Sequence, residues 1–186
     1  MLTTMGTPME GSVDYYVILL RVIHVFAGVF WAGGTFFFVS AIAPAVRLAG
    51  PDGGKFMQHL AQQGRMALSL SAAAVLSAAS GLLLYWRTSG HLNGAWITSG
   101  PGLALTIGGA SGLVAATYGA VFVRATSARM GQLARQIHAS GGPPLPEQQA
   151  EAQQLGAQLG TGAVWTAGLL VVALLGMSMS QYLFAF

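Results

Sequence analysis

Four long apolar stretches, at about residues 15–44, 61–86, 100–123 and 159–184, limit what this chain can fold into. A helix needs about 20 mostly apolar residues to cross the hydrocarbon core of a bilayer. The sequence of 186 residues is 54% hydrophobic and 7% charged, whereas a soluble domain usually carries about 25% charged residues. The sequence therefore predicts an all-α fold, an integral membrane four-helix bundle forming a single transmembrane domain over residues 1–186.

Three connections separate the spans. The first, residues 47–58, contains the turn-forming run Gly-Pro-Asp-Gly-Gly, which is expected to end one helix and start another. The second, residues 87–99, is short and polar. The third begins with residues 124–138, which read as a polar helical extension of span three. A Gly-Gly-Pro-Pro break then precedes an amphipathic helix that starts near Pro146 and leads into span four.

The basic residues predict the orientation, because Lys and Arg favour the cytoplasmic side of a membrane. Connections one and three and their flanks hold most of them, namely Arg47, Lys55, Arg65, Arg124, Arg129 and Arg135. Connection two holds Arg87. Both termini are therefore expected on the outer, periplasmic side. In this orientation several aromatic residues fall near the outer interface, where amphipathic rings prefer to sit, namely Tyr15, Tyr16, Trp86, Trp96 and Tyr182.

Composition excludes several classes of function. The chain has no cysteine, which excludes disulfides, thiolate metal sites and a cysteine nucleophile. The few basic residues stand at the ends of apolar runs, so they indicate topology rather than a nucleic-acid surface. All five carboxylates lie outside or at the edge of the spans, which leaves no paired-carboxylate site in the membrane. Autonomous catalysis is not expected.

Span one carries the most informative pattern. Arg21, His24, Gly28, Trp31 and Thr35 recur at steps of three and four residues, which places them on one helix face. A charge inside an apolar run costs several kcal/mol unless it is paired or hydrated, so Arg21 should face the bundle or reach the outer interface. Its expected partner is Asp14 or an anionic ligand group.

Residue counts from the midpoint of each span place a set of small, polar or sulfur-bearing residues at the depth of His24. They are Ser77, Ser80 and Gly81, then Thr106, Gly108 and Gly109, then Met177 and Met179. Haem iron accepts His together with a second His or Met as axial ligands. The pattern therefore raises the hypothesis of a haem b pocket, with His24 as metal ligand, Arg21 at a propionate, Gly28 allowing close approach, and Met177 or Met179 on the far side.

A simpler interpretation of His24 is a hydrogen bond to a serine or a carbonyl of a neighbouring helix. The other histidines give weaker signals. His59 is expected at the cytoplasmic end of span two, too far from His24 to share an iron. His91 lies in the outer loop, either solvated or folded inward as a second ligand, and His138 lies in a polar cytoplasmic segment with no assigned role.

The run from Leu20 to Gly34, LRVIHVFAGVFWAGG, resembles the first helix of a group of small bacterial membrane proteins. The group includes the copper-resistance D family, the membrane N-terminal region of certain urate oxidases, and the membrane-type protoporphyrinogen oxidases. The resemblance implies a multi-pass protein of the bacterial inner membrane and, in several branches, a haem b held by the first-helix histidine. The oxidase branch relies on a lysine in a later helix, whereas the single lysine here is Lys55 in connection one.

Three functions from different classes follow as hypotheses. The first is a haem b-binding electron-transfer subunit of a respiratory or photosynthetic chain, with quinone or a cytochrome as partner. The second is a cofactor-free accessory subunit that packs against other membrane subunits. The third is copper handling, although His24, Met177 and Met179 form at best one level and no ladder of ligands crosses the membrane.

Overall fold

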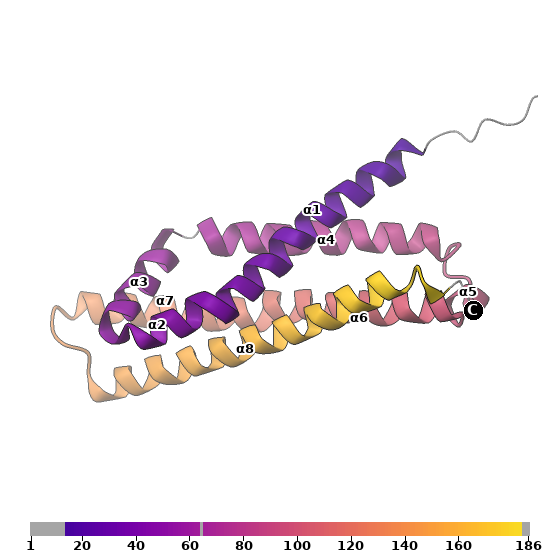
Figure 1. Ribbon diagram of the computed structural model, residues 1–186. Coiled ribbons are helices and arrows are strands. Elements are labelled where there is room, and N and C mark those ends of the chain that lie inside the picture. The colour runs from indigo at the N-terminus through magenta and orange to yellow at the C-terminus, as the bar shows by residue number, and fades with distance from the viewer. Residues whose placement is uncertain (1–13, 64, 184–186) are drawn as a thin grey trace, which may run out of the picture.

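The computed structural model describes residues 14–63 and 65–183 (Figure 1). This part of the chain folds into helices and their connections, with no strand. The helical segments, in chain order, are α1 (Tyr15–Phe37), η1 (Phe38–Ile42), α2 (Ala43–Leu48), α3 (Gly50–Gln63), α4 (Arg65–Thr88), α5 (Gly94–Ile97), α6 (Gly100–Tyr118), η2 (Gly119–Val123), α7 (Arg124–Ala139) and α8 (Pro146–Met179).

The described residues contain four helices long and apolar enough to span a membrane, as predicted. The segments long and apolar enough to cross a bilayer are Tyr15–Leu48, Leu68–Thr88, Gly100–Ala139 and Pro146–Met179. Two boundaries differ by a few residues from the approximate ones predicted. Residues 61–63 belong to α3 and not to span two. Span four ends at Met179, because the chain turns at Ser180, whose hydroxyl donates to the carbonyl of Met177.

The first connection is itself a helix, α3, and the expected break precedes it. Gly50 adopts a φ of 55°, a left-handed conformation that glycine reaches without steric cost. Gly53 then lies so close to α2 that a Cβ atom there would be 2.1 Å from the carbonyl oxygen of Val46. The Gly-Pro-Asp-Gly-Gly run therefore lies where one helix ends and the next begins, as predicted, and its glycines also allow α3 to pack closely on α2.

Two of the long helices each contain one π turn. In η1 the amide of Ala43 bonds to the carbonyl of Phe38, five residues earlier, just before Pro44. Proline has no amide hydrogen, and its ring crowds the carbonyl four residues earlier, so a widened turn lets the helix continue. In η2 the amide of Arg124 bonds to the carbonyl of Gly119. Each helix thus continues past its apolar part into α2 or α7.

The bundle is assembled from two helix pairs (Figure 1). Helices α1 and α4 pack closely, as do α6 and α8. The pairs meet in the middle of the bundle, where Trp31 of α1, Ala73 of α4, Ala115 of α6 and Leu170 of α8 form one buried cluster. The start of α1, the end of α4 and the end of α8 lie at one end of the bundle, and α2, α3 and α7 lie at the other.

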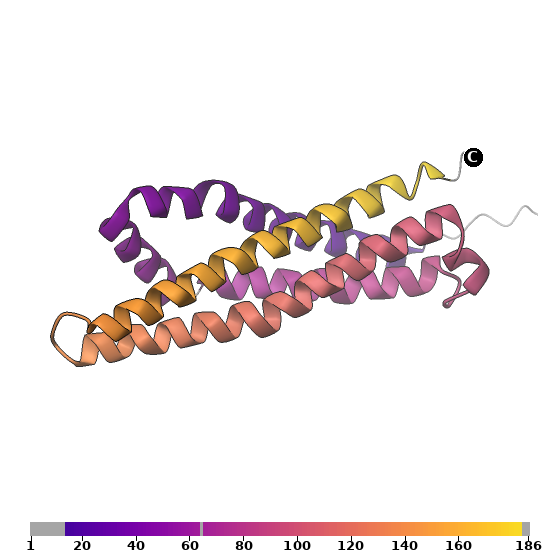
Figure 2. The same cartoon turned by 90° about the horizontal axis from the view of Figure 1, so that it is seen from below.

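Helices α7 and α8 continue together beyond the apolar spans (Figure 2). Leu133 and Leu155 are buried, and Arg129 donates from Nε to Glu151 at 2.7 Å. The segment from Gly100 to Ala139 contains 40 residues, or about 60 Å at a rise of about 1.5 Å per residue, against a hydrocarbon core of about 30 Å. The helical extension predicted over residues 124–138 and the new helix predicted from about Pro146 are therefore confirmed.

The helices bury little of their apolar surface against one another. Only 11% to 22% of the residues in the most apolar part of each span are buried within the chain. Large side chains such as Phe26, Val29 and Trp165 remain more than half exposed. A soluble monomer rarely exposes apolar surface on this scale, so the protein is a multi-pass membrane protein whose spans contact lipid.

Candidate functional site: His24 between α1 and α4

His24 faces α4. Its Nδ1 atom lies 2.8 Å from the backbone carbonyl oxygen of Ser77, and the ring is half-buried. A carbonyl oxygen only accepts hydrogen bonds, so Nδ1 carries the proton and donates it. In a neutral imidazole the other nitrogen, Nε2, then keeps its lone pair. The structure thus defines both the orientation of the ring and its tautomer.

Gly81 provides the space for the ring. It lies one helical turn after Ser77, and a Cβ atom there would be 2.7 Å from Cε1 and 3.0 Å from Nδ1 of His24. Any larger residue would push the imidazole away from the Ser77 carbonyl. Two glycines of α1 continue the close approach: a Cβ at Gly28 would be 3.3 Å from Oγ of Ser77, and one at Gly34 would be 2.7 Å from Leu70. We call this contact the α1–α4 seam.

The second ring nitrogen is open. Within residues 14–63 and 65–183, no hydrogen-bond partner lies near Nε2 of His24. The same described residues contain no buried side-chain nitrogen or oxygen that lacks a hydrogen-bond partner. Nε2 is therefore accessible from outside the chain. An imidazole with one nitrogen fixed by a carbonyl and the other open is the usual arrangement of a metal-ligating histidine.

Arg21 lies one turn before His24 and is exposed. The proposed pairing of Arg21 with Asp14 was wrong, because Asp14 accepts from Arg87 at the end of α4 and also caps the first turn of α1 through Val17. In the described part of the chain Arg21 has no ion-pair partner. Of the two expected partners, the anionic ligand group is the one that the structure leaves open.

Met177 and Met179 belong to a different contact. A Cβ added at Gly108 of α6 would lie 3.1 Å from the backbone nitrogen of Met177, so this residue lies where α8 packs on α6. The side chain of Met179 is 55% exposed. In Figure 1 the first turns of α1 lie above α4 and the end of α8 lies below it. A shared depth in the membrane is therefore not enough to place the sulfur atom of either methionine near Nε2 of His24, where an iron would bind.

The remaining histidines lie away from this seam. His59 is exposed on α3, rather than on span two as expected, because α3 is a separate helix. His91 is exposed in the loop after α4, where its ring packs edge-on against Trp86 with centroids 5.4 Å apart. His138 is exposed in the last turn of α7. Among the described residues, no group of three or more His, Cys, Asp or Glu side chains lies close enough together to hold a metal ion.

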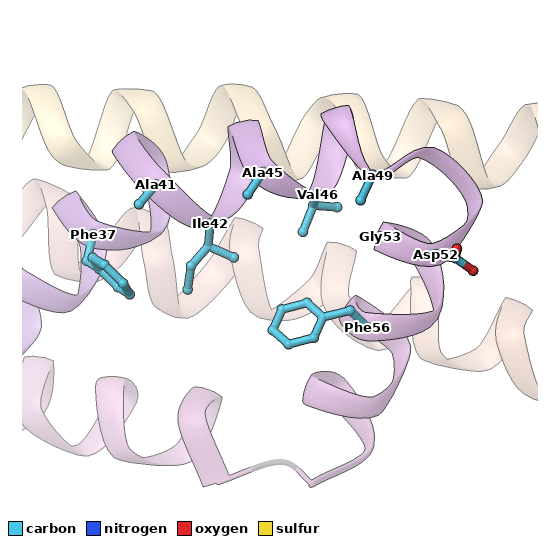
Figure 3. A pocket seen from close by; sticks show the side chains of 9 residues that line it. All are labelled: Phe37, Ala41, Ile42, Ala45, Val46, Ala49, Asp52, Gly53 and Phe56. Atoms are coloured by element: carbon cyan, nitrogen blue, oxygen red, sulfur yellow. The ribbon is translucent and has the colours of Figure 1, made fainter.

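A separate hollow, with a volume of about 440 Å³, lies between α2 and α3. Figure 3 shows apolar side chains of η1 and α2 facing Phe56 of α3, with the carboxylate of Asp52 turned away from them. None of the predicted site residues lines this hollow. It is an apolar recess and contributes nothing to the chemistry around His24.

These contacts fit a haem group in part. His24 has the donor chemistry of an axial ligand, and Arg21 is an available cation one turn away. Gly28 leaves no space for a macrocycle within the seam, because Ser77 of α4 fills the position beside it. The residues fit a haem that approaches Nε2 from the open side of the α1–α4 pair. They do not outline a pocket enclosed among all four helices.

Comparison with known proteins adds no identification. No protein-family model matches the chain, and no curated protein or solved structure is significantly similar to it.

Proposed function

We propose that this chain is a haem b-binding membrane protein that transfers electrons, in which Nε2 of His24 would hold the haem iron. The observation that carries the proposal is the 2.8 Å hydrogen bond from Nδ1 of His24 to the Ser77 carbonyl, together with the open Nε2. A membrane-embedded imidazole with an unsatisfied nitrogen is costly without a ligand. A metal bound at Nε2 would remove that cost.

The residues around His24 have distinct roles in this proposal. The Ser77 carbonyl holds the Nδ1 proton, which fixes the ring and makes Nε2 a stronger ligand. Gly81 keeps the ring against α4 because it has no side chain. Arg21 would pair with a haem propionate near the membrane surface. When bound, the haem supplies an iron that accepts and donates single electrons.

The setting of this activity is also part of the proposal. The distribution of arginines favours an orientation with both termini on the outer side of the membrane, and the resemblance of the first span to small bacterial membrane proteins favours the bacterial inner membrane. His24 would then lie near the periplasmic surface, one turn inward from Arg21. A respiratory or photosynthetic chain would supply the partner, a quinone or another cytochrome.

A second candidate is a cofactor-free accessory subunit of a larger membrane complex. The observation that favours it is the tight fit of the imidazole against Gly81, which makes His24 a hydrogen-bonded link between two helices. Here the exposed apolar faces would contact neighbouring subunits. Copper handling, the third hypothesis, has no comparable support, since a His-rich cluster is not found within the described residues.

A visible absorption spectrum of the purified full chain, oxidised and then reduced with dithionite, tests the proposal. The expected result is a Soret band and sharp reduced bands that disappear in His24→Ala. His59→Ala is the matched control, because it removes an exposed histidine from α3, and it should keep the spectrum. A folded wild-type protein without colour, expressed with ample haem, would overturn the proposal and favour the accessory subunit. Copper analysis of the same sample tests the third hypothesis.

A further inference from the structure

A small cleft lies between α2 and α8, on the other side of α2 from the recess of Figure 3. Its volume is about 80 Å³. One charged group, Arg47, stands among apolar and small residues from both helices. The lining residues are Phe38, Val39, Ala43, Pro44, Arg47, Gly160, Ala163 and Val164.

Arg47 reaches across this cleft. A Cβ at Gly160 would be 3.2 Å from Nη2 of Arg47, so the guanidinium lies against the backbone of α8. In the described ranges no carboxylate lies within ion-pair distance of Arg47. Glu151, the acid of α8 with a side-chain partner, bonds to Arg129 instead. Within residues 14–63 and 65–183, the charge of Arg47 is thus not neutralised by an ion pair.

The depth of Arg47 in the membrane follows from the sequence. The 25 residues between Arg21 and Arg47 include no charged side chain. At a helical rise of about 1.5 Å per residue, the two arginines are about 39 Å apart along the helix. A hydrocarbon core is about 30 Å thick, and about 40–45 Å with its headgroups. A helix that crosses the bilayer with moderate tilt therefore holds Arg47 at the level of the lipid phosphates.

We propose that this cleft binds one anionic phospholipid. Arg47 donates hydrogen bonds to the phosphate, and Val39, Ala163 and Val164 contact the start of an acyl chain. This inference rests on three observations. The guanidinium of Arg47 has no ion-pair partner among the described residues, an apolar cleft lies beside it, and both lie at the depth of the lipid phosphates. Basic pockets between membrane helices bind anionic headgroups in this way. The proposal is independent of the proposed haem site, which lies near the start of α1.

Native mass spectrometry of the full chain in neutral detergent, titrated with phosphatidylglycerol or phosphatidylcholine, tests the site. Wild type should retain one phosphatidylglycerol at concentrations where phosphatidylcholine is lost. Arg47→Gln should weaken this binding about tenfold, because a charge-assisted hydrogen bond is lost. Gly160→Val keeps the charge but closes the cleft, and it should weaken binding by a similar factor.

The matched control is Arg135→Gln, which removes the same charge from the exposed surface of α7 at the same end of the bundle. It should leave binding unchanged. Equal weakening by Arg135→Gln and Arg47→Gln would overturn the proposal, since the attraction would then be diffuse. Full binding by Gly160→Val would also overturn it. Inorganic phosphate should not displace the lipid, and displacement at equal concentration would assign the site to free phosphate instead. Unchanged helical circular dichroism verifies that each variant is folded.

Discussion

The two helix pairs of this bundle use glycine in different ways. In the α6–α8 pair, a Cβ at Gly176 would be 2.7 Å from the carbonyl oxygen of Ala104, and one at Gly108 would be 3.0 Å from that of Ala173. The backbones of α6 and α8 are therefore in direct contact. In the α1–α4 seam, Gly81 faces the imidazole of His24, a side chain with hydrogen-bonding chemistry. Small residues let helices approach closely in lipid, but only the second contact places a reactive group.

This difference bears on the proposed function. A contact between backbones serves packing alone, because it leaves no side-chain atom available to a ligand. The α1–α4 seam holds a polar ring by one nitrogen and leaves the other accessible. We therefore treat α6–α8 as the structural pair and α1–α4 as the pair that carries the site.

The largest expected effect lies in the structural pair. Gly176→Ala should destabilise the protein by about 2–3 kcal/mol, since neither backbone can yield without moving its helix. Gly168→Ala is the matched control, because it lies on the same helix with nothing within 4 Å of its Cβ position. Unfolding in detergent with increasing denaturant measures both. Equal stability of the two variants would show that the backbones of α6 and α8 are not in close contact at Gly176.

A substitution in the α1–α4 seam should lower stability less, but it should change the surroundings of His24 more. Gly81→Ala should displace the His24 ring and cost about 1 kcal/mol, because the imidazole can rotate away where a backbone cannot. The protein should lose the spectral signature proposed above, or show it shifted. Gly33→Ala, with open space around its Cβ position, is the control. An unchanged ring environment, measured by the histidine NMR signals, would contradict the assigned contact.

The smallest effect concerns the ion pair that links the start of α1 to the end of α4. Arg87 and Asp14 have side chains that are 49% and 43% exposed. A double-mutant cycle with Arg87→Gln and Asp14→Asn should give a coupling energy of about 0.2–1 kcal/mol. The coupling should fall as salt is added. A coupling energy larger than the stability lost in Gly81→Ala would mean that this ion pair, and not the glycine contacts of the seam, holds α1 on α4.

Much of the site was accessible from the sequence. Counting from span midpoints placed Ser77 and Gly81 at the depth of His24, and both residues contact its ring. The same count placed Met177 at that depth, but depth says nothing of the direction in which a helix face points. The pairing of Asp14 with Arg87 joins residues 73 positions apart, and no local spacing rule reaches that far.

The amino-acid sequence alone determined that the solvent of this protein is a bilayer, that four helices cross it, and that one histidine lies within the first. Length and apolarity decide these properties residue by residue. The tertiary structure decided which helices pair and which face of each turns inward. Apolar spans have little hydrophobic periodicity to orient them in lipid, so close contacts such as Gly81 with His24 and Gly176 with Ala104 fix their rotation.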